Sequence, residues 1–178
     1  MLRPAKDERG LTLVELILAM MVLGIISGVV ANLLAYYNGL GRMTYLVLQK
    51  QNELQSVVNR ILDGFGEKSG LITAKAYSLS GTLDPCGLGD TAYRSSIAFT
   101  ITDNTVFTYR YESGQLFLKV DDAPEMLLME NLSCFAVKEN GTNIVQLRIR
   151  STVSGTGGER PVEIATQVKP RNAGKGGS

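Results

Sequence analysis

A short charged leader comes first in the chain, and a long stretch of apolar residues follows it. Residues 11–34 contain a single charged side chain, Glu15. A helix of this length is about 36 Å long, enough to cross the hydrocarbon core of a bilayer. A carboxylate within such a run is expensive, which makes it by default a functional residue with a partner. The pattern therefore predicts a membrane-spanning helix with a candidate functional site at Glu15.

Small residues recur along one side of this predicted membrane helix. Ser27 and Gly28 lie three and four residues after Gly24, and Ala31 lies four and three residues after them. Such spacing lets two helices approach closely in lipid. The alternative is that the membrane helix merely tolerates small residues.

The helical pattern continues past the apolar run with an amphipathic periodicity. Apolar residues recur at three- and four-residue spacings from Met43 to Leu62, with polar residues between them. Asn38, Gly39 and Gly41 allow a kink where the helix would leave the membrane. Glycines at 64, 66 and 70 end the pattern. We expect the helix to reach about residue 62 and to pack its apolar stripe on a following sheet.

After residue 70 the pattern changes to short segments rich in β-branched and aromatic residues, which indicate strands. Turn residues such as Asn-Gly and Ser-Gly separate them. The segments predict a meander of antiparallel hairpins, with strands at 96–102, 106–112, 115–120, 132–139, 144–150 and 162–168. The aromatic residues on them indicate core and cross-strand pairs. We expect the Gly- and Pro-containing loop 79–91 to cross over the helix.

Together these patterns predict an α+β protein in which a long N-terminal helix packs on an antiparallel β-sheet. The predicted organisation is a leader, a membrane half of the helix, an amphipathic half, a globular β head and a disordered tail. Their ranges are 1–10, 11–34, 35–64, 65–169 and 170–178.

The junction between leader and apolar run reads Gly10-Leu11-Thr12-Leu13-Val14-Glu15. This stretch resembles the cleavage and assembly signal of type IV prepilins and type II secretion pseudopilins. The resemblance implies that a prepilin peptidase cuts between Gly10 and Leu11 and methylates the new amine of Leu11. It also implies that Glu15 pairs with that amine on a neighbouring subunit and sets the register of a filament. The alternative is a polar residue near the membrane edge without a partner.

The C-terminal half extends the resemblance to a subgroup. Residues 130–132, 140–149 and 165–172 resemble J-type pseudopilins and W-type minor pilins, which share this globular pattern. K-type pseudopilins typically lack the glutamate that Glu15 supplies. The resemblance leaves a type IV pilus and a secretion pseudopilus open as the destination. It implies a structural subunit of the initiation or tip complex, with a pilin-like fold, no enzymatic activity and no cofactor.

The same resemblance implies partners and a location. The partners are prepilin peptidase, other pilins or pseudopilins in a hetero-oligomeric filament, an inner-membrane assembly platform and membrane lipid. The chain would cross the inner membrane once, with its head in the periplasm or outside, and would then enter the filament. A secretory signal has a shorter apolar core that precedes its cleavage site. Here the apolar run follows the cut, so the helix would be retained.

The charge balance argues against a nucleic-acid partner. The chain has 18 basic and 17 acidic residues. The leader holds three basic and two acidic residues, which leaves fifteen of each in the mature chain. A neutral chain lacks the electrostatic footprint of a polyanion binder. The weak positive bias of the leader favours the cytoplasmic side of the membrane.

Two cysteines, Cys86 and Cys134, follow the membrane run. If the head faces an oxidising compartment, these two form a disulfide, and two buried free thiols are the alternative. A link across a loop of this size contributes about 4 kcal/mol to stability in the chain-entropy model.

Candidate metal and catalytic residues are weak in this sequence. The absence of histidine excludes histidine triads and histidine metal sites. Two groups of carboxylates could hold calcium, but neither has a coordinating spacing, so solvated loops are expected. These are Asp84 with Asp90, and Asp121 with Asp122 and Glu125. Five cations could form a basic face, although scattered solvated charge is the preferred interpretation: Lys138, Arg148, Arg150, Arg160 and Lys169. We predict no metal site and no catalytic residue.

One different class of protein stays open at this point. Residues 35–178 alone could make a ligand-binding α+β domain on an uncleaved single-pass anchor, as in an extracytoplasmic sensor. An intact leader and a monomer in membranes would mark that class. An acid–base enzyme using Asp121 or Glu125 lacks a supporting constellation of residues.

Overall fold

The structure, a computed structural model, describes residues 12–64, 69–141, 143–155 and 158–171. Gly10, Leu11, the leader and residues 172–178 lie outside this part of the chain. The chain divides into two compact units between Arg42 and Met43. A single α-helix, α1 (Leu13–Asp63), contributes residues to both units. It continues without a break through Asn38, Gly39 and Gly41, where the sequence allowed a kink.

The first unit consists, in its described part, of the N-terminal portion of α1. Residues 12–38 are exposed, and their apolar side chains cover the helix on all sides. In the described chain, α1 is the one helix long and apolar enough to cross a membrane. This exposure follows from the sequence, because a run that is apolar all round has no polar face to turn towards water.

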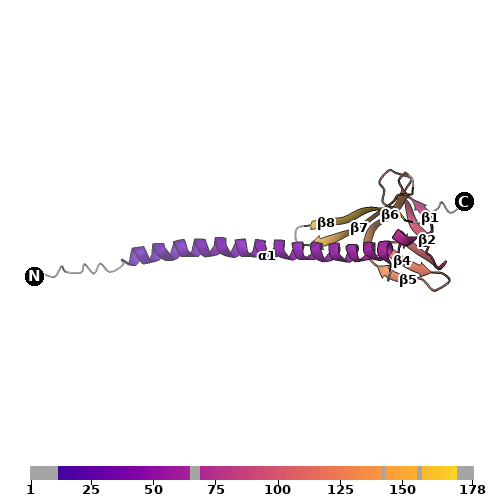
Figure 1. The fold of residues 1–178 in the computed structure, drawn as a ribbon. Helices are drawn as coiled ribbons and strands as arrows, with labels where there is room; N and C mark the ends of the chain where they lie inside the picture. Colours follow the sequence, from indigo (N-terminus) through magenta and orange to yellow (C-terminus); the bar gives the residue numbers. More distant parts are fainter. Residues whose placement is uncertain (1–11, 65–68, 142, 156–157, 172–178) are drawn as a thin grey trace, which may run out of the picture. The chain divides into compact units, whose positions relative to one another are not determined.

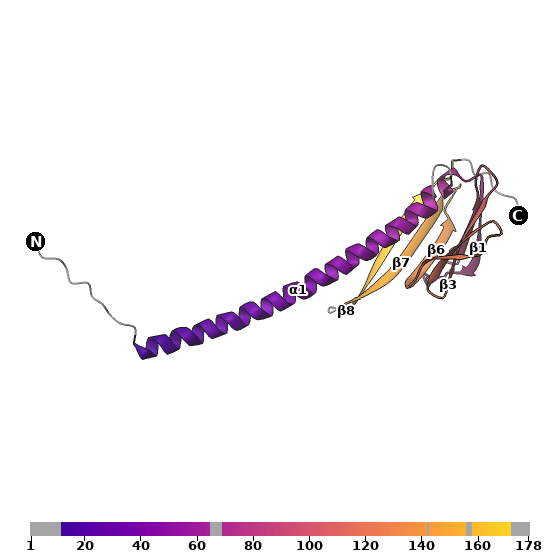
Figure 2. The ribbon, with the colours of Figure 1, turned by 90° about the horizontal axis from the view of Figure 1, so that it is seen from below.

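The second unit is a head in which the C-terminal half of α1 lies along a large antiparallel sheet (Figures 1 and 2). A short 3-10 helix, η1 (Leu71–Thr73), precedes the sheet. The strands are β1 (Ala76–Leu83), β2 (Arg94–Thr100), β3 (Val106–Glu112), β4 (Gln115–Val120), β5 (Met126–Met129), β6 (Leu132–Glu139), β7 (Val145–Gly155) and β8 (Gly158–Val168).

The sheet consists of two hairpin series joined at one seam. The strand order is β5-β4-β3-β2-β6-β7-β8, and β1 also pairs with β2. β2 and β6 pair at a single position, Arg94 opposite Val137. By contrast, β7 and β8 pair along their entire length. The β2–β6 seam therefore has far less backbone pairing than the hairpins on either side of it.

The core lies between α1 and one face of the sheet. Alternate residues of β7 are buried from Val145 to Val153, as expected of a strand with one face on a core. Phe99 of β2 lies opposite Phe107 of β3 with ring centroids 5.7 Å apart, which confirms the predicted cross-strand aromatic pairing. The helix contributes five buried residues to this core: Met43, Leu54, Val57, Val58 and Ile61.

The structure confirms the predicted α+β class and most of the predicted strands. Three strands, β3, β4 and β6, have the predicted bounds. β2 is shifted by two residues, and β7 and β8 are longer than predicted because they continue into a long hairpin. β1 and β5 were not predicted.

The prediction of a loop at 79–91 that crosses over the helix was wrong for its first residues. Residues 79–83 belong to β1 and pair with β2, so they do not cross over the helix. The pairing register shifts between Ser80 and Leu83, where Gly81 has a φ of 91°. A glycine within a strand often marks such a bulge. The glycine that suggested a loop therefore belongs to an irregular strand.

The first two residues of the predicted tail are packed onto the head. Pro170 is buried, and the Arg171 backbone N–H donates to the Ile72 carbonyl at 2.9 Å. Both residues therefore belong to the head.

Candidate assembly site and the disulfide-linked head

Glu15 lies in the first turn of α1 and hydrogen-bonds to Thr12. Its Oε2 accepts from the Thr12 backbone N–H and from Thr12 Oγ1, both at 2.9 Å. The Glu15 N–H donates to Thr12 Oγ1 at 3.3 Å. This reciprocal pattern is a capping box, in which a Thr and a Glu three residues later satisfy the free N–H groups of a helix start.

The capping box is a local structural feature of Glu15 that the sequence analysis missed. Its signal is the Thr-x-x-Glu spacing of residues 12–15 directly before an apolar run. The glutamate side chain is exposed and turned towards the start of the helix. It therefore already stabilises α1 within its own chain, and an incoming amine would meet a carboxylate that Thr12 orients.

The glycines of the exposed run have no packing partner in this chain. A Cβ atom built at Gly24 or Gly28 meets nothing within 4 Å. Within the described part of the chain, nothing therefore requires glycine at these positions. Small residues here would matter only where another helix comes close.

Residues 5–31 match the prokaryotic N-terminal methylation motif. The match includes Gly10 and Leu11, and it ends within the apolar part of α1. It supports a type IV pilin-like protein, and the motif implies processing by prepilin peptidase and assembly with other pilins. The apolar helix that follows fits the single-pass membrane anchor of such a protein. No curated protein and no solved structure matches the chain.

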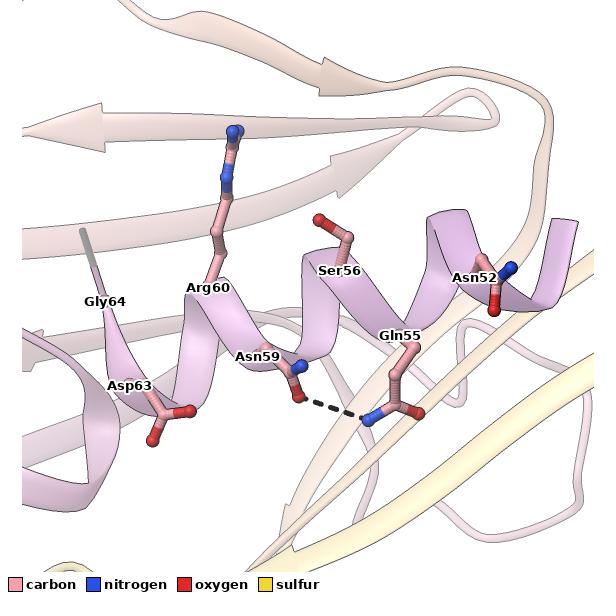
Figure 3. A pocket seen from close by; sticks show the side chains of 7 residues that line it. All are labelled: Asn52, Gln55, Ser56, Asn59, Arg60, Asp63 and Gly64. Carbon is pink, nitrogen blue, oxygen red and sulfur yellow. Dashed lines mark hydrogen bonds between the residues drawn. The ribbon is translucent and has the colours of Figure 1, made fainter. Parts of the chain in front are cut away.

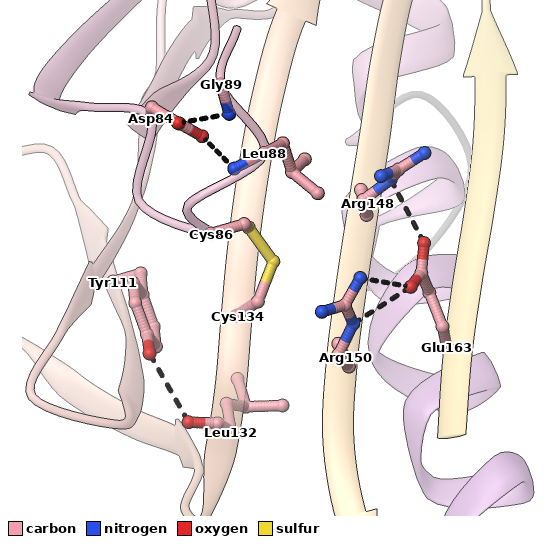
Figure 4. Close-up of a disulfide and its surroundings, with 10 residues drawn as sticks. All are labelled: Asp84, Cys86, Leu88, Gly89, Tyr111, Leu132, Cys134, Arg148, Arg150 and Glu163. Carbon is pink, nitrogen blue, oxygen red and sulfur yellow. Dashed lines mark hydrogen bonds and ion pairs between the residues drawn. A yellow bond between two sulfur atoms is a disulfide. The ribbon is translucent and has the colours of Figure 1, made fainter. Parts of the chain in front are cut away.

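Outside this motif, the two cysteines form a disulfide at the seam of the sheet. Cys86, in the loop after β1, joins Cys134 of β6 with their Cα atoms 5.1 Å apart (Figure 4). Tyr93 and Ala136 are buried beside Cys134, and Cys86 and Leu88 pack against them. The disulfide therefore fixes the loop 84–93 to the sheet together with a small second core.

The two loop aspartates support this loop through hydrogen bonds and an ion pair. The Asp84 carboxylate accepts hydrogen bonds from the N–H groups of Leu88 and Gly89, both at 2.7 Å (Figure 4). Asp90 pairs with Lys138 of β6 at 2.9 Å. The Lys138 ammonium and the N–H of Ala92 lower the pKa of Asp90 below its ordinary value.

Two residues of the second acidic cluster, Asp121 and Glu125, form contacts within the head. Asp121 accepts a hydrogen bond from the Val106 N–H at 2.7 Å. Glu125 forms an ion pair with Arg110 at 2.6 Å, and Arg110 also pairs with Glu112. In the described residues, no group of three or more Cys, Asp or Glu side chains could hold a metal ion.

Three cations of the basic face considered above lie in ion pairs. Arg148 and Arg150 of β7 both pair with Glu163 of β8, at 3.0 and 2.7 Å (Figure 4). Lys138 pairs with Asp90, and Lys138 and Arg148 both lie over the ring of Tyr93. The local positive charge is therefore largely balanced by neighbouring carboxylates.

Two surface hollows lie along the C-terminal part of α1. The larger, about 430 Å³, is lined by polar residues of one helix (Figure 3). Its side chains include Gln55 and Asn59, which hydrogen-bond to each other at 3.1 Å. The smaller, about 300 Å³, lies between α1 and β5, with Leu128 and Met129 on the strand side. Neither contains the convergent set of titratable groups that an active site requires.

Proposed function

We propose that this protein is a minor pilin or pseudopilin, a structural subunit that is cleaved by prepilin peptidase and assembled into a filament. One observation carries the proposal. The methylation motif at 5–31 leads directly into a helix whose N-terminal part is apolar and exposed on all sides. Bilayer and filament are the two settings that would cover such a surface.

In this proposal the peptidase cuts between Gly10 and Leu11, and Leu11 becomes the methylated first residue. Glu15 then lies five residues into the mature chain, where its carboxylate pairs with the amine of a neighbouring subunit. A buried ion pair has its best attested use in fixing register. Thr12 would hold the carboxylate ready for that pairing through the observed hydrogen bonds.

The proposed location is the inner membrane, crossed once, with the head on the periplasmic side. A disulfide within the head is consistent with an oxidising compartment. The partners would be prepilin peptidase, other pilins or pseudopilins, an inner-membrane assembly platform and lipid. The protein would act as a subunit of the initiation or tip complex of a type IV pilus or a type II secretion pseudopilus, without enzymatic activity or a cofactor.

Intact mass and N-terminal sequencing of the membrane-extracted protein, produced with and without prepilin peptidase, test the proposal. We expect a chain that starts at methylated Leu11 only when the peptidase is present. A chain that still starts at Met1 in both cases would contradict the proposal and favour an uncleaved, membrane-anchored binding domain.

A further inference from the structure

Two polar positions frame the apolar part of α1. Glu15 lies in its first turn, and Tyr36 and Tyr37 follow residues 16–35, which contain no Asp, Glu, Lys or Arg. Along the helix axis, the Cα atoms of Glu15 and Tyr36 are about 32 Å apart at 1.5 Å per residue. The hydrocarbon core of a typical bilayer is about 30 Å thick. The spacing of the two positions therefore matches the layer that the helix would cross.

The tyrosine pair has the form of an interfacial anchor. Tyr36 and Tyr37 are 64% and 65% exposed, and their ring centroids are 6.1 Å apart in an edge-to-face arrangement. Successive helical residues point about 100° apart, so the two rings cover a wide arc at nearly one height. Tyrosine combines an apolar ring with a polar hydroxyl and is enriched where a membrane meets water.

The direction of the Glu15 side chain supplies a second, independent observation. Both of its side-chain hydrogen bonds go to Thr12, which lies on the N-terminal side. The carboxylate is therefore turned away from residues 16–35 and towards the end of the helix. Long polar side chains near the ends of membrane helices reach for the interface in this manner.

We propose that Tyr36 and Tyr37 bind the lipid headgroup layer on the outer side of the membrane and thereby hold Glu15 at the inner boundary of the hydrocarbon core. This inference rests on the membrane anchor of the proposed function. The occupant is lipid because the intervening residues are apolar and exposed on every side of the helix. Asn32, the one amide among residues 16–35, lies one turn before Tyr36, near the outer end.

The proposed depth of Glu15 explains how the membrane accommodates its carboxylate. A carboxylate at the boundary avoids most of the penalty of a charge at the bilayer centre. Membrane residence then needs no cation beside Glu15. The need for a partner arises when the subunit leaves the bilayer for an apolar filament interior.

A depth measurement tests the proposal on the full chain. The sequence contains no tryptophan, so Leu18→Trp provides a single fluorescent reporter. The protein is reconstituted in phosphatidylcholine–phosphatidylglycerol vesicles, and quenching by lipids brominated at different acyl positions gives the distance of the indole from the bilayer centre. A second protein also carries Leu33→Tyr, Leu34→Tyr, Tyr36→Leu and Tyr37→Leu, which move the pair three residues inward at constant composition.

If the pair sets the depth, the helix slides outward by three residues and the reporter moves about 4.5 Å closer to the bilayer centre. An unchanged reporter depth overturns the proposal. Tyr45→Leu is the matched control because Tyr45 is 68% exposed on the same helix. It should leave the depth unchanged, and an equal shift would also overturn the proposal. A reporter that no brominated lipid quenches would contradict the membrane anchor itself, together with this inference.

Discussion

Met43 of α1 lies directly against Gly155 of β7. A Cβ atom at position 155 would be only 2.5 Å from the Met43 sulfur. Met43 is 4% exposed and is the first residue of the head unit. The absence of a side chain at 155 therefore makes room for the methionine at the point where α1 joins the head.

This contact predicts that Gly155→Ala destabilises the head. The added methyl group forces the end of the flexible Met43 side chain to move. Gly155 itself is exposed, so the expected loss is that of a shifted rotamer, about 1 kcal/mol. Denaturant unfolding of the full chain in detergent measures the loss. Gly41→Ala is the matched control, because a Cβ there meets nothing within 4 Å.

A double variant shows whether the methionine is the cause. In Gly155→Ala combined with Met43→Ala, the cost of the added methyl group should disappear, because Met43→Ala removes the clash. Additive losses would mean that Gly155 is needed for another reason.

The disulfide predicts a large stability loss when it is removed. Cys86 and Cys134 are 48 residues apart, for which the chain-entropy model gives about 4 kcal/mol. Cys86→Ser with Cys134→Ser should lower the free energy of unfolding by about this amount. A reductant should destabilise the natural protein similarly and leave the double variant unchanged. Equal stability with and without reductant in the natural protein would contradict this role.

The Asp90–Lys138 ion pair predicts a pH-dependent contribution to stability. Its cause is the lowered pKa of the Asp90 carboxyl in the folded state, which results first from Lys138. A carboxyl with a lowered folded pKa stabilises the protein above its unfolded pKa of about 3.9 and loses this effect as the pH falls through the folded pKa. Lys138→Met should therefore be less stable than the natural protein at neutral pH, with a difference that shrinks in acid.

Unfolding curves of both proteins between neutral and strongly acidic pH check this prediction, together with an NMR titration of the Asp90 carboxyl. Lys169→Met is the control, since Lys169 lies outside this ion pair. A stability difference that stays constant with pH would show that the lysine acts by packing alone.

Glu15 has an observed capping role and a proposed pairing role, which substitutions can separate. Glutamine can replace glutamate in a capping box but cannot carry its charge. We expect Glu15→Ala and Glu15→Gln both to be processed and both to fail in filament assembly. Immunoblots of the processed chain and of sheared filaments measure the two steps. Normal assembly of Glu15→Gln would mean that the capping role is sufficient.

Gly10 is the residue on which processing depends in the proposed function. Gly10→Ala, or a bulkier residue, should block loss of the leader. Mass spectrometry of the membrane fraction distinguishes the two chain lengths. Normal processing of this variant would remove the basis for assigning the cut to this position.

The sequence predicted the elements whose signal is local. The apolar run and the amphipathic stripe define α1, and the Ser113-Gly114 turn separates β3 from β4 because both residues adopt positive φ. Glu15 stood out because it is the one charge in its run. The capping role of Thr12 is also a local signal, because it follows from the Thr-x-x-Glu spacing.

What the sequence could not reveal depends on pairing between distant segments. β1 carries a bulge at Gly81 that resembles a loop, and β5 is a four-residue edge strand after Asp121, Asp122 and Pro124. No local pattern in the sequence indicates that β2 pairs with β6 instead of continuing a simple meander. These three features arise from strand partners that only the folded chain defines.

The β2–β6 seam has a mechanical consequence. Strand pairing joins β2 to β6 at one position, and the Asp90–Lys138 ion pair reinforces this line. The disulfide and the hydrogen bond from Tyr111 to the Leu132 carbonyl also cross it (Figure 4). Under a pulling load the halves would separate there first, because few hydrogen bonds resist tearing. The covalent link converts this weakest line into one that cannot open without breaking a bond, so the oxidised head would yield elsewhere.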